Sequence, residues 1–343
     1  MNFKHVRLAS LEYALPEEIW TSADLETQLA PMYERLGLRE GRIELMTGIK
    51  ARHVWPKGTM PSDASAMAGL KTLEKSNFSA KDMQVLVHSS VCRDQMEPAT
   101  ASYVHHKMGL SSQCHVMDIS NACLGFLNAS VSLAAMIESG QVDCGMVVAG
   151  ENGRPLLEST VKKLLEPDLN RKSIKPWLAS LTIGCGAVAG ILCHEKLAPH
   201  APKLTSGIVR ADSSGSALCE GDGSHDGLLM QTDSEQLLNQ GVDLAKKTWD
   251  DFLAIDPLDG AKIDHMITHQ VGRAHRKKLY ESLNQPIEKD FSTFEELGNI
   301  GSVSLPITLA KAREAGRLKE NDGIALCGIG SGINCMIMGM VWA

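Results

Sequence analysis

The chain has 343 residues, of which 43% are hydrophobic and 22% charged, the balance of a globular protein with a sizeable core. This composition excludes disordered, collagen-like and coiled-coil chains. A net charge of −7, with acidic residues spread along the chain, also excludes a nucleic-acid-binding footprint. At this length the chain holds two ordinary domains or one duplicated fold.

Cysteine usage and the N-terminal residues favour a cytoplasmic protein. Nine cysteines form no CxxC pair, and several stand inside apolar runs, so we expect no disulfide framework. The first 20 residues lack the long apolar stretch of a signal peptide, and no apolar run approaches the roughly 20 residues that span a bilayer. We therefore predict a protein without a membrane span in a reducing compartment.

Short apolar runs typical of strands alternate with amphipathic stretches typical of helices. The predicted strands cover 85–91, 115–119, 144–149, 187–192, 265–268, 324–328 and 335–341, and the predicted helices cover 64–75, 99–108, 124–139, 234–253 and 304–314. This alternation predicts an α/β fold. A charged, Pro-containing helical stretch at 151–181 breaks the pattern and is interpreted as an inserted lid, and 211–226 is the most loop-like segment.

An internal repeat relates the two halves of the chain. Residues 129–150 and 304–330 share one plan, a helix, a Glu-x-Gly turn and a strand that ends in Gly. An offset of 176 residues places Gly140 on Gly316 and also places Cys123 on Asn299. The strand-like segments that end at Val91 and Val271 align at an offset of 180. We therefore predict two copies of one α/β unit, although all βαβ proteins share some of this pattern.

Cys123 is the strongest candidate nucleophile. It lies in the turn NACLG between a predicted strand and a nearly apolar helix, where unpaired N–H groups and the helix dipole favour a thiolate. A helix that is apolar all round must be buried, so a tunnel would have to lead to the thiol. A buried, inert cysteine is the alternative.

His269 and Asn299 are the next candidates. His269 follows the end of a predicted strand, where open α/β folds place ligands, and Asn299 lies in the Gly-flanked turn LGNIGS before a helix. A solvated histidine and an ordinary turn residue are the alternatives. The repeat favours function, because it places Cys123 and Asn299 in equivalent turns that would face each other.

The turn GIGSGIN at 328–334 joins two predicted strands. No helix and no Lys-Ser/Thr pair follow it, so it is not a phosphate-binding loop. It is either a hairpin turn or a backbone oxyanion hole beside the reacting carbonyl. The chain also lacks a metal-ligand spacing, a GxGxxG motif followed by an acidic residue, and a GxSxG motif, so we expect no metal and no nicotinamide cofactor.

At these residues the chain resembles the thiolase superfamily, in its ketoacyl-ACP synthase III branch, over nearly its whole length. The resemblance implies the thiolase fold, an α/β fold with duplicated halves at 1–195 and 196–343 in a five-layered αβαβα arrangement. It also implies a catalytic set of Cys123, His269 and Asn299. The motifs that carry it are ALPEEIWTSADLE (14–26), TGIKAR (47–52), NAC, THQ, GIGSG and LGNIGS, the last with a Gly at 301 where the family usually has Ser.

Within this branch the chain is most similar to the OleA family, which joins two fatty acyl-CoAs head to head in bacterial olefin biosynthesis. The segment SVCRDQMEPATAS (90–102) resembles the one that carries that family's catalytic glutamate, which falls on Glu97, and Cys185 stands where initiation enzymes typically have Asp. Removing an α-proton from a thioester requires a general base, and burial in a largely apolar pocket would make Glu97 a competent one. A helix-start carboxylate beside Pro98 is the alternative.

The resemblance implies a ping-pong Claisen condensation without a cofactor beyond the CoA thioester substrates. Cys123 takes the first acyl group, while backbone N–H groups of Cys123 and of the turn Gly330, Ser331 and Gly332 hold the oxyanion. Glu97 then deprotonates a second acyl-CoA whose enolate oxygen bonds His269 and Asn299. The resemblance further implies a homodimer in which the glutamate comes from the partner subunit, and medium or long acyl chains.

Three other functions stay open at the level of the sequence. The first is a decarboxylating 3-oxoacyl-ACP synthase III, which uses malonyl-ACP; the basic run RAHRKK at 273–278 would then dock the acyl carrier protein. The second is an aldol enzyme similar to hydroxymethylglutaryl-CoA synthase, for which this chain is short. The third is a non-catalytic acyl-binding or partner subunit, which would not need Cys123, His269 and Asn299 together.

Overall fold

Nine strands form one mixed sheet in the computed structural model, which describes residues 1–224, 227–255 and 257–343. Two further strand pairs lie outside this sheet: β2 (Ile19–Thr21) with β3 (Ala51–His53), and β9 (Cys219–Ser224) with β10 (Gly227–Thr232). The order across the large sheet is β11 (Ile263–Thr268), β12 (Gly323–Gly330), β13 (Asn334–Val341), β8 (Lys203–Ala211), β1 (Val6–Ala14), β7 (Gly186–His194), β6 (Cys144–Glu151), β4 (Val85–His88) and β5 (His115–Asp118).

The sheet consists of two halves in which four strands follow the same order and directions, and β5 extends the first half beyond β4. In the first half β4 runs parallel to β6, and β6, β7 and β1 follow in antiparallel order. In the second half β11 runs parallel to β12, and β12, β13 and β8 follow in antiparallel order. The halves are joined between β1 and β8 through the pair Arg7 and Lys203. The predicted duplicated α/β fold is confirmed, while a division of the chain at residue 195 stays a prediction.

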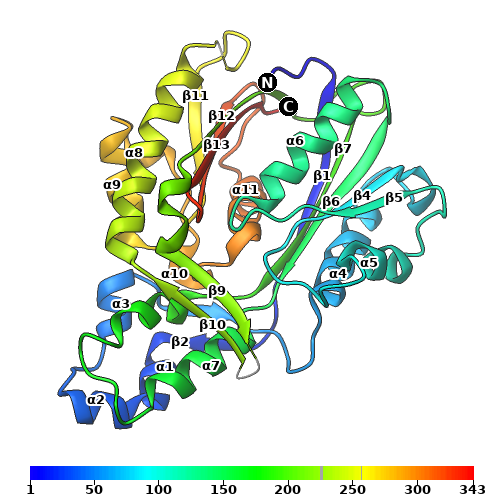
Figure 1. Cartoon of the computed structure of the whole chain (residues 1–343). Coiled ribbons are helices and arrows are strands. Elements are labelled where there is room, and N and C mark those ends of the chain that lie inside the picture. Colours follow the sequence, from blue (N-terminus) through cyan, green and yellow to red (C-terminus); the bar gives the residue numbers. More distant parts are fainter. Residues whose placement is uncertain (225–226, 256) are drawn as a thin grey trace.

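Helices complete five layers around the two halves of the sheet (Figure 1). Between the halves lie α6 (Gly125–Glu138) and α11 (Ser304–Glu314), each of which packs against strands of the sheet. The outer face of the first half carries α4 (Pro61–Glu74) and α5 (Thr100–Met108). The outer face of the second half carries α8 (Ser234–Leu253) and α9 (Arg273–Ser282).

The burial of each element follows from its layer. Every residue of β6 is buried, because helices cover both faces of its half of the sheet, and its sequence is accordingly a continuous apolar run. The middle helix α6 buries Phe126, Leu127 and Leu133 among its apolar residues, as a helix between two sheet layers must. The outer helix α8 instead buries a single stripe that includes Val242 and Trp249.

Two predicted segments differ from the structure. The strand predicted at 85–91 ends at His88, because the N–H groups of Val91 and Cys92 bond the Glu151 carboxylate rather than a neighbouring strand. The loop predicted at 211–226 is wrong in part, since β9 forms an antiparallel ladder with β10; residues 225 and 226 lie outside the described residues. The Gly, Ser and Asp residues of β9 have low strand propensity, so β9 is a strand only because it pairs with β10.

Near one end of the molecule lie the helices α1 (Ser22–Gln28), α2 (Ala30–Leu36), α3 (Arg42–Thr47), α7 (Arg154–Leu164) and α10 (Phe294–Leu297) (Figure 1). The segment predicted as a helical lid contains α7 and a 3-10 helix (Lys175–Thr182), and both pack against β10. In the described part of the chain, no helix has the length and apolar content that crossing a bilayer requires. The other elements are 3-10 helices at Ala80–Asp82, Ser213–Leu218, Ile287–Lys289 and Gly301–Val303.

Candidate active site

A cavity of about 410 Å³ is lined by residues from both halves of the chain. Segments from α3, α7, β10, α8 and the start of α9 contribute to its wall, which is largely apolar. Of the residues predicted for the site, Cys123, His269, Asn299, Gly330 and Ser331 lie on this wall. Glu97 and Gly332 do not line it. Other polar or reactive residues on the wall include Cys92, Glu151, Cys219, Arg273 and His275.

A chain of amide side chains holds the turn that carries Cys123. The Asn121 Nδ2 donates to the Asn128 Oδ1 at 2.8 Å, so the turn is bonded to the first part of α6. Asn334, at the start of β13, donates from Nδ2 to the Asn121 Oδ1 at 3.3 Å and to the Ser331 carbonyl at 3.2 Å. The nucleophile turn and the glycine-rich turn are therefore bonded to each other across the two halves.

The surroundings of Cys123 favour the neutral thiol. Burial raises the pKa of the thiol to about 12, and the nearby charge of Glu151 acts in the same direction. The prediction that the turn favours the thiolate is therefore wrong. Helix α6 begins at Gly125, so Cys123 precedes its first turn, and desolvation outweighs any help from the helix dipole.

The glycine-rich turn joins β12 and β13 as a hairpin and lies against the backbone of Cys123. A Cβ added at Gly330 would lie 3.6 Å from the Cys123 nitrogen and 3.2 Å from the Leu124 Cγ. A side chain at position 330 would therefore crowd the turn that carries Cys123 and Leu124. Of the two uses left open by the sequence, the structure shows the hairpin turn, while the oxyanion hole stays a prediction.

His269 is a buried, neutral imidazole at the edge of the cavity. It follows β11, and its backbone N–H donates to the Cys327 carbonyl at 2.9 Å. Burial lowers its pKa to about 3, with a smaller contribution from His275. Among the described residues, the buried Nδ1 has no hydrogen-bond partner.

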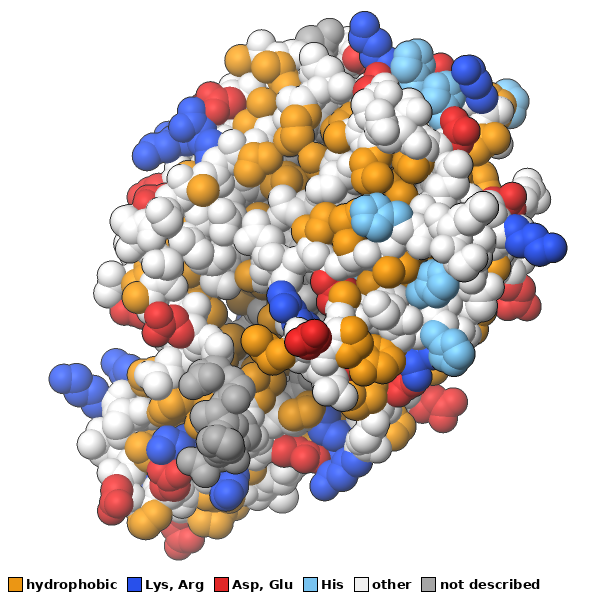
Figure 2. Space-filling model, turned by 45° about the vertical axis from the view of Figure 1, so that its right-hand side comes forward, with side chains coloured by type: hydrophobic (Ala, Val, Ile, Leu, Met, Phe, Trp, Pro, Cys, Tyr) orange, Lys and Arg blue, Asp and Glu red, His pale blue; other side chains and the backbone are white. Residues whose placement is uncertain are grey.

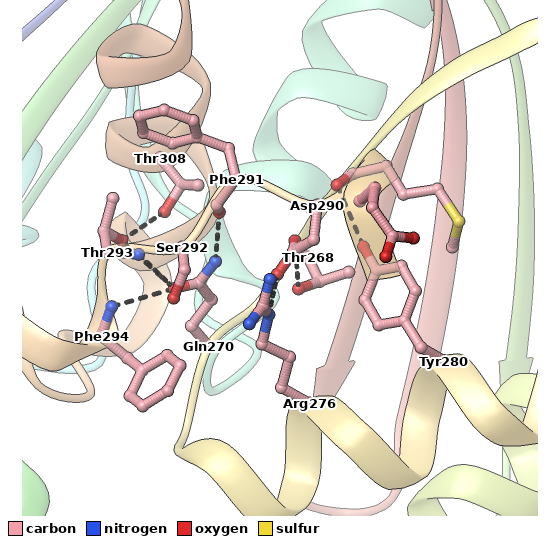
Figure 3. A network of polar contacts seen from close by, with 12 residues as sticks. Thr268, Gln270, Arg276, Tyr280, Asp290, Phe291, Ser292, Thr293, Phe294 and Thr308 are labelled. Carbon is pink, nitrogen blue, oxygen red and sulfur yellow. Dashed lines mark hydrogen bonds and ion pairs between the residues drawn. The ribbon is translucent and has the colours of Figure 1, made fainter. Parts of the chain in front are cut away.

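Gln270 fixes the chain directly after His269 (Figure 3). Its Oε1 accepts the N–H groups of Thr293 at 2.7 Å and Phe294 at 3.0 Å, and its Nε2 donates to the Phe291 carbonyl at 2.6 Å. A buried polar group that is satisfied in this way holds a segment rigidly. The residue after the histidine therefore orders the segment that leads to Asn299.

The predicted basic run at 273–278 is not a uniformly free positive surface. Arg276 forms an ion pair with the fully buried Asp290 (Figure 3), and Lys277 forms one with Glu281. Burial raises the pKa of the Asp290 carboxyl, and the Arg276 guanidinium opposes that rise. Arg273, by contrast, is exposed and lies on the cavity wall. Docking of an acyl carrier protein at this run stays a prediction.

The turn of Asn299 is held by backbone bonds from the first half of the chain. Its N–H donates to the Thr182 carbonyl at 2.8 Å, and its carbonyl accepts the N–H of Gly184 at 2.9 Å. The side-chain Oδ1 accepts the N–H of Gly301 at 3.1 Å. This bond orients the amide and leaves its NH₂ group as the end that can donate to a ligand.

Glu97 lies outside the cavity of its own chain. Its side chain is exposed, and it belongs to the segment between β4 and α5. The predicted apolar pocket around Glu97 is therefore absent from the described residues of this single chain. Met96 beside it is 92% exposed and Val91 is 50% exposed.

Comparisons with known proteins identify the family. Residues 253–342 match the family model described as 3-oxoacyl-[acyl-carrier-protein (ACP)] synthase III C terminal. Over the full length of both chains, the sequence is 37% identical to the acyl-CoA:acyl-CoA alkyltransferase of Xanthomonas campestris pv. campestris and 38% identical to that of Shewanella oneidensis. The chain belongs to the acyl-CoA:acyl-CoA alkyltransferase family. The predicted resemblance to OleA-type enzymes of the thiolase superfamily is thereby confirmed.

Solved structures agree with this family. The chain matches cerulenin-bound X. campestris OleA with a TM-score of 0.93 and 37% identity, over 100% of this chain and 98% of the other. The beta-ketoacyl-[acyl-carrier-protein] synthase III of Rhodopirellula baltica is more distant, at 27% identity over 97% of each chain. The chain therefore belongs to a family of condensing acyltransferases and has their fold.

Glu151 is the main residue of the alkyltransferase cavity that sequence reasoning missed. It is 4% exposed, ends β6 and lies on the cavity wall. His269 was predicted because it is a polar residue at the carboxyl end of a predicted strand. Glu151 meets the same criterion, so the same argument could have identified it. In the described ranges, no three His, Cys, Asp or Glu side chains are grouped so that they could hold a metal ion.

Proposed function

We propose that this alkyltransferase joins two fatty acyl-CoAs head to head by a non-decarboxylative Claisen condensation that yields a β-ketoacyl-CoA. The observation that carries the proposal is the convergence of Cys123, His269 and Asn299 on one largely apolar cavity wall in a full-length relative of acyl-CoA:acyl-CoA alkyltransferases. The apolar wall suits alkyl chains. No cofactor is needed beyond the thioester substrates.

In the first half-reaction Cys123 attacks the thioester carbonyl of one acyl-CoA. Because the thiol is neutral, it must lose its proton as the S–C bond forms, and the proposed acceptor is the imidazole of His269, which lies on the same wall and has a ring nitrogen without a hydrogen-bond partner among the described residues. The backbone N–H groups of Cys123 and of the turn at Gly330 and Ser331 stabilise the oxyanion. CoA leaves as a thiol with the transferred proton, and an acyl-Cys remains.

In the second half-reaction Glu97 removes an α-proton from a second acyl-CoA. The enolate oxygen accepts hydrogen bonds from the Asn299 NH₂ group and from His269, and the α-carbon attacks the acyl-Cys carbonyl. Cleavage of the C–S bond releases the Cys123 thiolate, which takes up the proton that Glu97 removed, so Cys123 returns to a thiol and Glu97 to a carboxylate. A decarboxylating enzyme would need no such base, so Glu97 separates the two reactions.

We propose that Glu97 acts in the cavity of a partner subunit within a homodimer. Its own side chain is exposed, next to the exposed Met96, and the nearby strand β5 has only one neighbour, β4, in the sheet. The face that carries β5, α4 and α5 shows patches of hydrophobic side chains with histidines among them (Figure 2). A second copy on this face would cover these patches.

The variants solved for the X. campestris protein support the same residue types. OleA from that organism has been solved with substitutions at a cysteine, a glutamate and a histidine. We further propose that the alkyltransferase acts in the cytoplasm, since all nine cysteines are free, and that its product feeds olefin biosynthesis.

The test of the reaction is CoA release from myristoyl-CoA alone, compared with the same assay plus malonyl-ACP, with products identified by mass. We expect a β-keto product or its decarboxylated ketone from myristoyl-CoA alone. Glu97→Gln should lower this condensation about 10²–10⁴-fold while Cys123 still accepts the first acyl group. Product that requires malonyl-ACP, with Glu97→Gln harmless, would instead show an initiation-type synthase.

The test of the dimer is complementation between two inactive variants. Cys123→Ala lacks the nucleophile and Glu97→Gln lacks the base, so each alone should not condense. If Glu97 acts in the partner's cavity, a refolded mixture regains turnover, because the Glu97→Gln subunit receives Glu97 from the other. A mixture that stays inactive, although native mass spectrometry of differently tagged chains shows mixed dimers, would place the base in its own chain.

A further inference from the structure

The Glu151 carboxylate accepts hydrogen bonds from both halves of the molecule. Its Oε1 accepts the N–H of Val91 at 2.9 Å, the N–H of Ser302 at 3.2 Å and the Ser302 hydroxyl. Its Oε2 accepts the N–H of Cys92 at 3.2 Å. Three of these donors bond Oε1 and one bonds Oε2, so the carboxylate is a structural acceptor that joins two segments of the chain.

The donors belong to the two segments that carry Glu97 and Asn299, which are residues of the proposed reaction. Val91 and Cys92 open the segment that carries Glu97, and Ser302 lies three residues after Asn299. One side chain at the end of β6 therefore holds the start of one segment and the turn of the other. A shift of either segment would misplace a group relative to Cys123.

The contact with Gly301 explains why this chain has glycine where the family motif G-N-x-S usually has serine. A Cβ at Gly301 would lie 3.1 Å from both the Glu151 Cδ and Oε1, and the glycine has a φ of +57°. A serine would crowd the carboxylate and also strain the backbone. The glycine and the buried glutamate therefore fit each other.

The charge of Glu151 also acts on the nucleophile. After desolvation, it is the largest cause of the raised pKa of Cys123, ahead of a smaller effect of Cys219. Geometry and charge thus connect Glu151 to all three parts of the site.

We infer that Glu151 is a positioning residue of the condensation: its carboxylate holds the Glu97 segment and the Asn299 turn together and places a negative charge on the cavity wall that also carries Cys123. The inference rests on the proposed condensation, but its structural part does not depend on turnover. Two substitutions separate the charge from the reach of the side chain. Glu151→Gln removes the charge at nearly constant shape, and Glu151→Asp keeps the charge but shortens the side chain by one methylene group.

The first experiment measures the pH profile of Cys123 alkylation by iodoacetamide, read from the Cys123 peptide by mass spectrometry. Because alkylation follows the thiolate fraction, Glu151→Gln should react about tenfold faster than wild type at the same pH. Glu151→Asp should follow the wild-type profile. Glu12→Gln is the matched control, since Glu12 is also a buried carboxylate, 5% exposed, but pairs with Arg313 and does not line the cavity.

The second experiment measures hydrogen exchange of residues 91–99 and 299–303, together with condensation of myristoyl-CoA. Both Glu151 variants should exchange faster in both segments and condense about 10²-fold more slowly, whereas Glu12→Gln should match wild type in these segments. Ser302→Ala removes one donor and keeps the charge, so it should loosen 299–303 alone and leave the alkylation profile unchanged.

Unchanged alkylation and unchanged exchange in Glu151→Gln would overturn the inference. If Glu151→Gln does not fold, an unaltered exchange pattern in both Glu151→Asp and Ser302→Ala would overturn it equally. If wild type fails to condense acyl-CoAs while the alkylation and exchange changes occur as expected, the proposed reaction is wrong and the structural role of Glu151 stands.

Discussion

Two histidines lie at equivalent strand ends of the duplicated fold, His88 at the end of β4 and His269 directly after β11. Both are buried, and burial lowers the pKa of both, so both are neutral at pH 7. They differ in their partners. The His88 Nε2 is 3.0 Å from the Ser90 Oγ and its Nδ1 is 3.7 Å from the Asp118 carboxylate, whereas the His269 Nδ1 has no partner among the described residues.

The difference teaches how one fold position serves two purposes. The bonding groups of His88 are used inside the first half, where Asp118 also accepts the N–H groups of Thr100 and Ala101 at the start of α5. His269 instead lies on the cavity wall. Burial alone does not single out a candidate functional histidine, whereas an incompletely bonded ring on a cavity wall does.

The largest effect is expected from Cys123→Ala. Cys123 belongs to the same half of the fold as His88, so this variant tests whether that half supplies a catalytic residue as well as structural support. Cys123→Ala should lower CoA release from myristoyl-CoA by at least about 10⁴-fold, because it removes the only proposed site of the acyl intermediate. Cys219→Ala, which changes another cysteine of the cavity wall, should keep most of the activity. Comparable losses in both variants would show that Cys123 has no special role.

The second prediction contrasts the two histidines directly. His269→Ala should lower kcat about 10²–10⁴-fold with little change in the free energy of unfolding, since a catalytic proton-transfer or hydrogen-bonding group is lost. His88→Ala should destabilise the protein by about 3 kcal/mol, because it leaves a cavity in the buried core and removes the hydrogen-bond partner of the Ser90 hydroxyl. Enzyme assays and urea unfolding measure the two quantities. A large loss of kcat in His88→Ala, together with a loss of stability alone in His269→Ala, would show that His88 is the catalytic histidine and His269 the structural one.

The third prediction concerns pH. The folded-state pKa of His269 is about 3, below the unfolded value, so the unfolded chain binds this proton first and acid favours unfolding. Relative to His269→Asn, wild type should lose about 1.4 kcal/mol of stability per pH unit as the pH falls from about 6.5 toward 3. Urea unfolding at pH 7.5 and 5.5 measures this difference. Parallel curves for the two proteins would mean that His269 titrates normally.

The smallest expected effects concern the neighbours of the two histidines. Ser90→Ala removes a hydroxyl that accepts the N–H of Gly150 at 2.6 Å, and should cost about 1 kcal/mol of stability without changing kcat. Gln270→Leu removes the bonds to the backbone at 291–294, and should cost about 2–3 kcal/mol and lower kcat about fivefold through the shifted Asn299 turn. Equal kcat values in both variants would contradict the coupling of Gln270 to Asn299.

Much of the fold could be predicted from sequence because its central elements have continuous signals. Apolar runs in β6, β12 and β13 and the apolar helix α6 have one compact arrangement, with helices on both sheet faces. The repeat also predicted that the turns of Cys123 and Asn299 approach each other. The ladder of β9 with β10 could not be predicted, because Gly and Ser in β9 have no strand preference of their own.

The protonation and bonding of the site depended on contacts between distant segments. Sequence reasoning favoured a Cys123 thiolate from the local turn, whereas burial by the surrounding elements makes the thiol neutral. It expected Glu97 in an apolar pocket, whereas within one chain the side chain is exposed. It missed Glu151, whose four donors come from segments about 60 and 150 residues away.

By itself, the sequence determined the α/β class, the internal duplication and the residue types of the candidate site, because these depend on local apolar periodicity and on motifs that are short in the chain. Only the tertiary structure decided that the His269 ring is incompletely bonded among the described residues, that the Glu151 carboxylate joins the two halves and that burial raises the pKa of the Cys123 thiol. Desolvation and hydrogen-bond satisfaction are properties of the packed neighbourhood, and residues far apart in the chain build that neighbourhood.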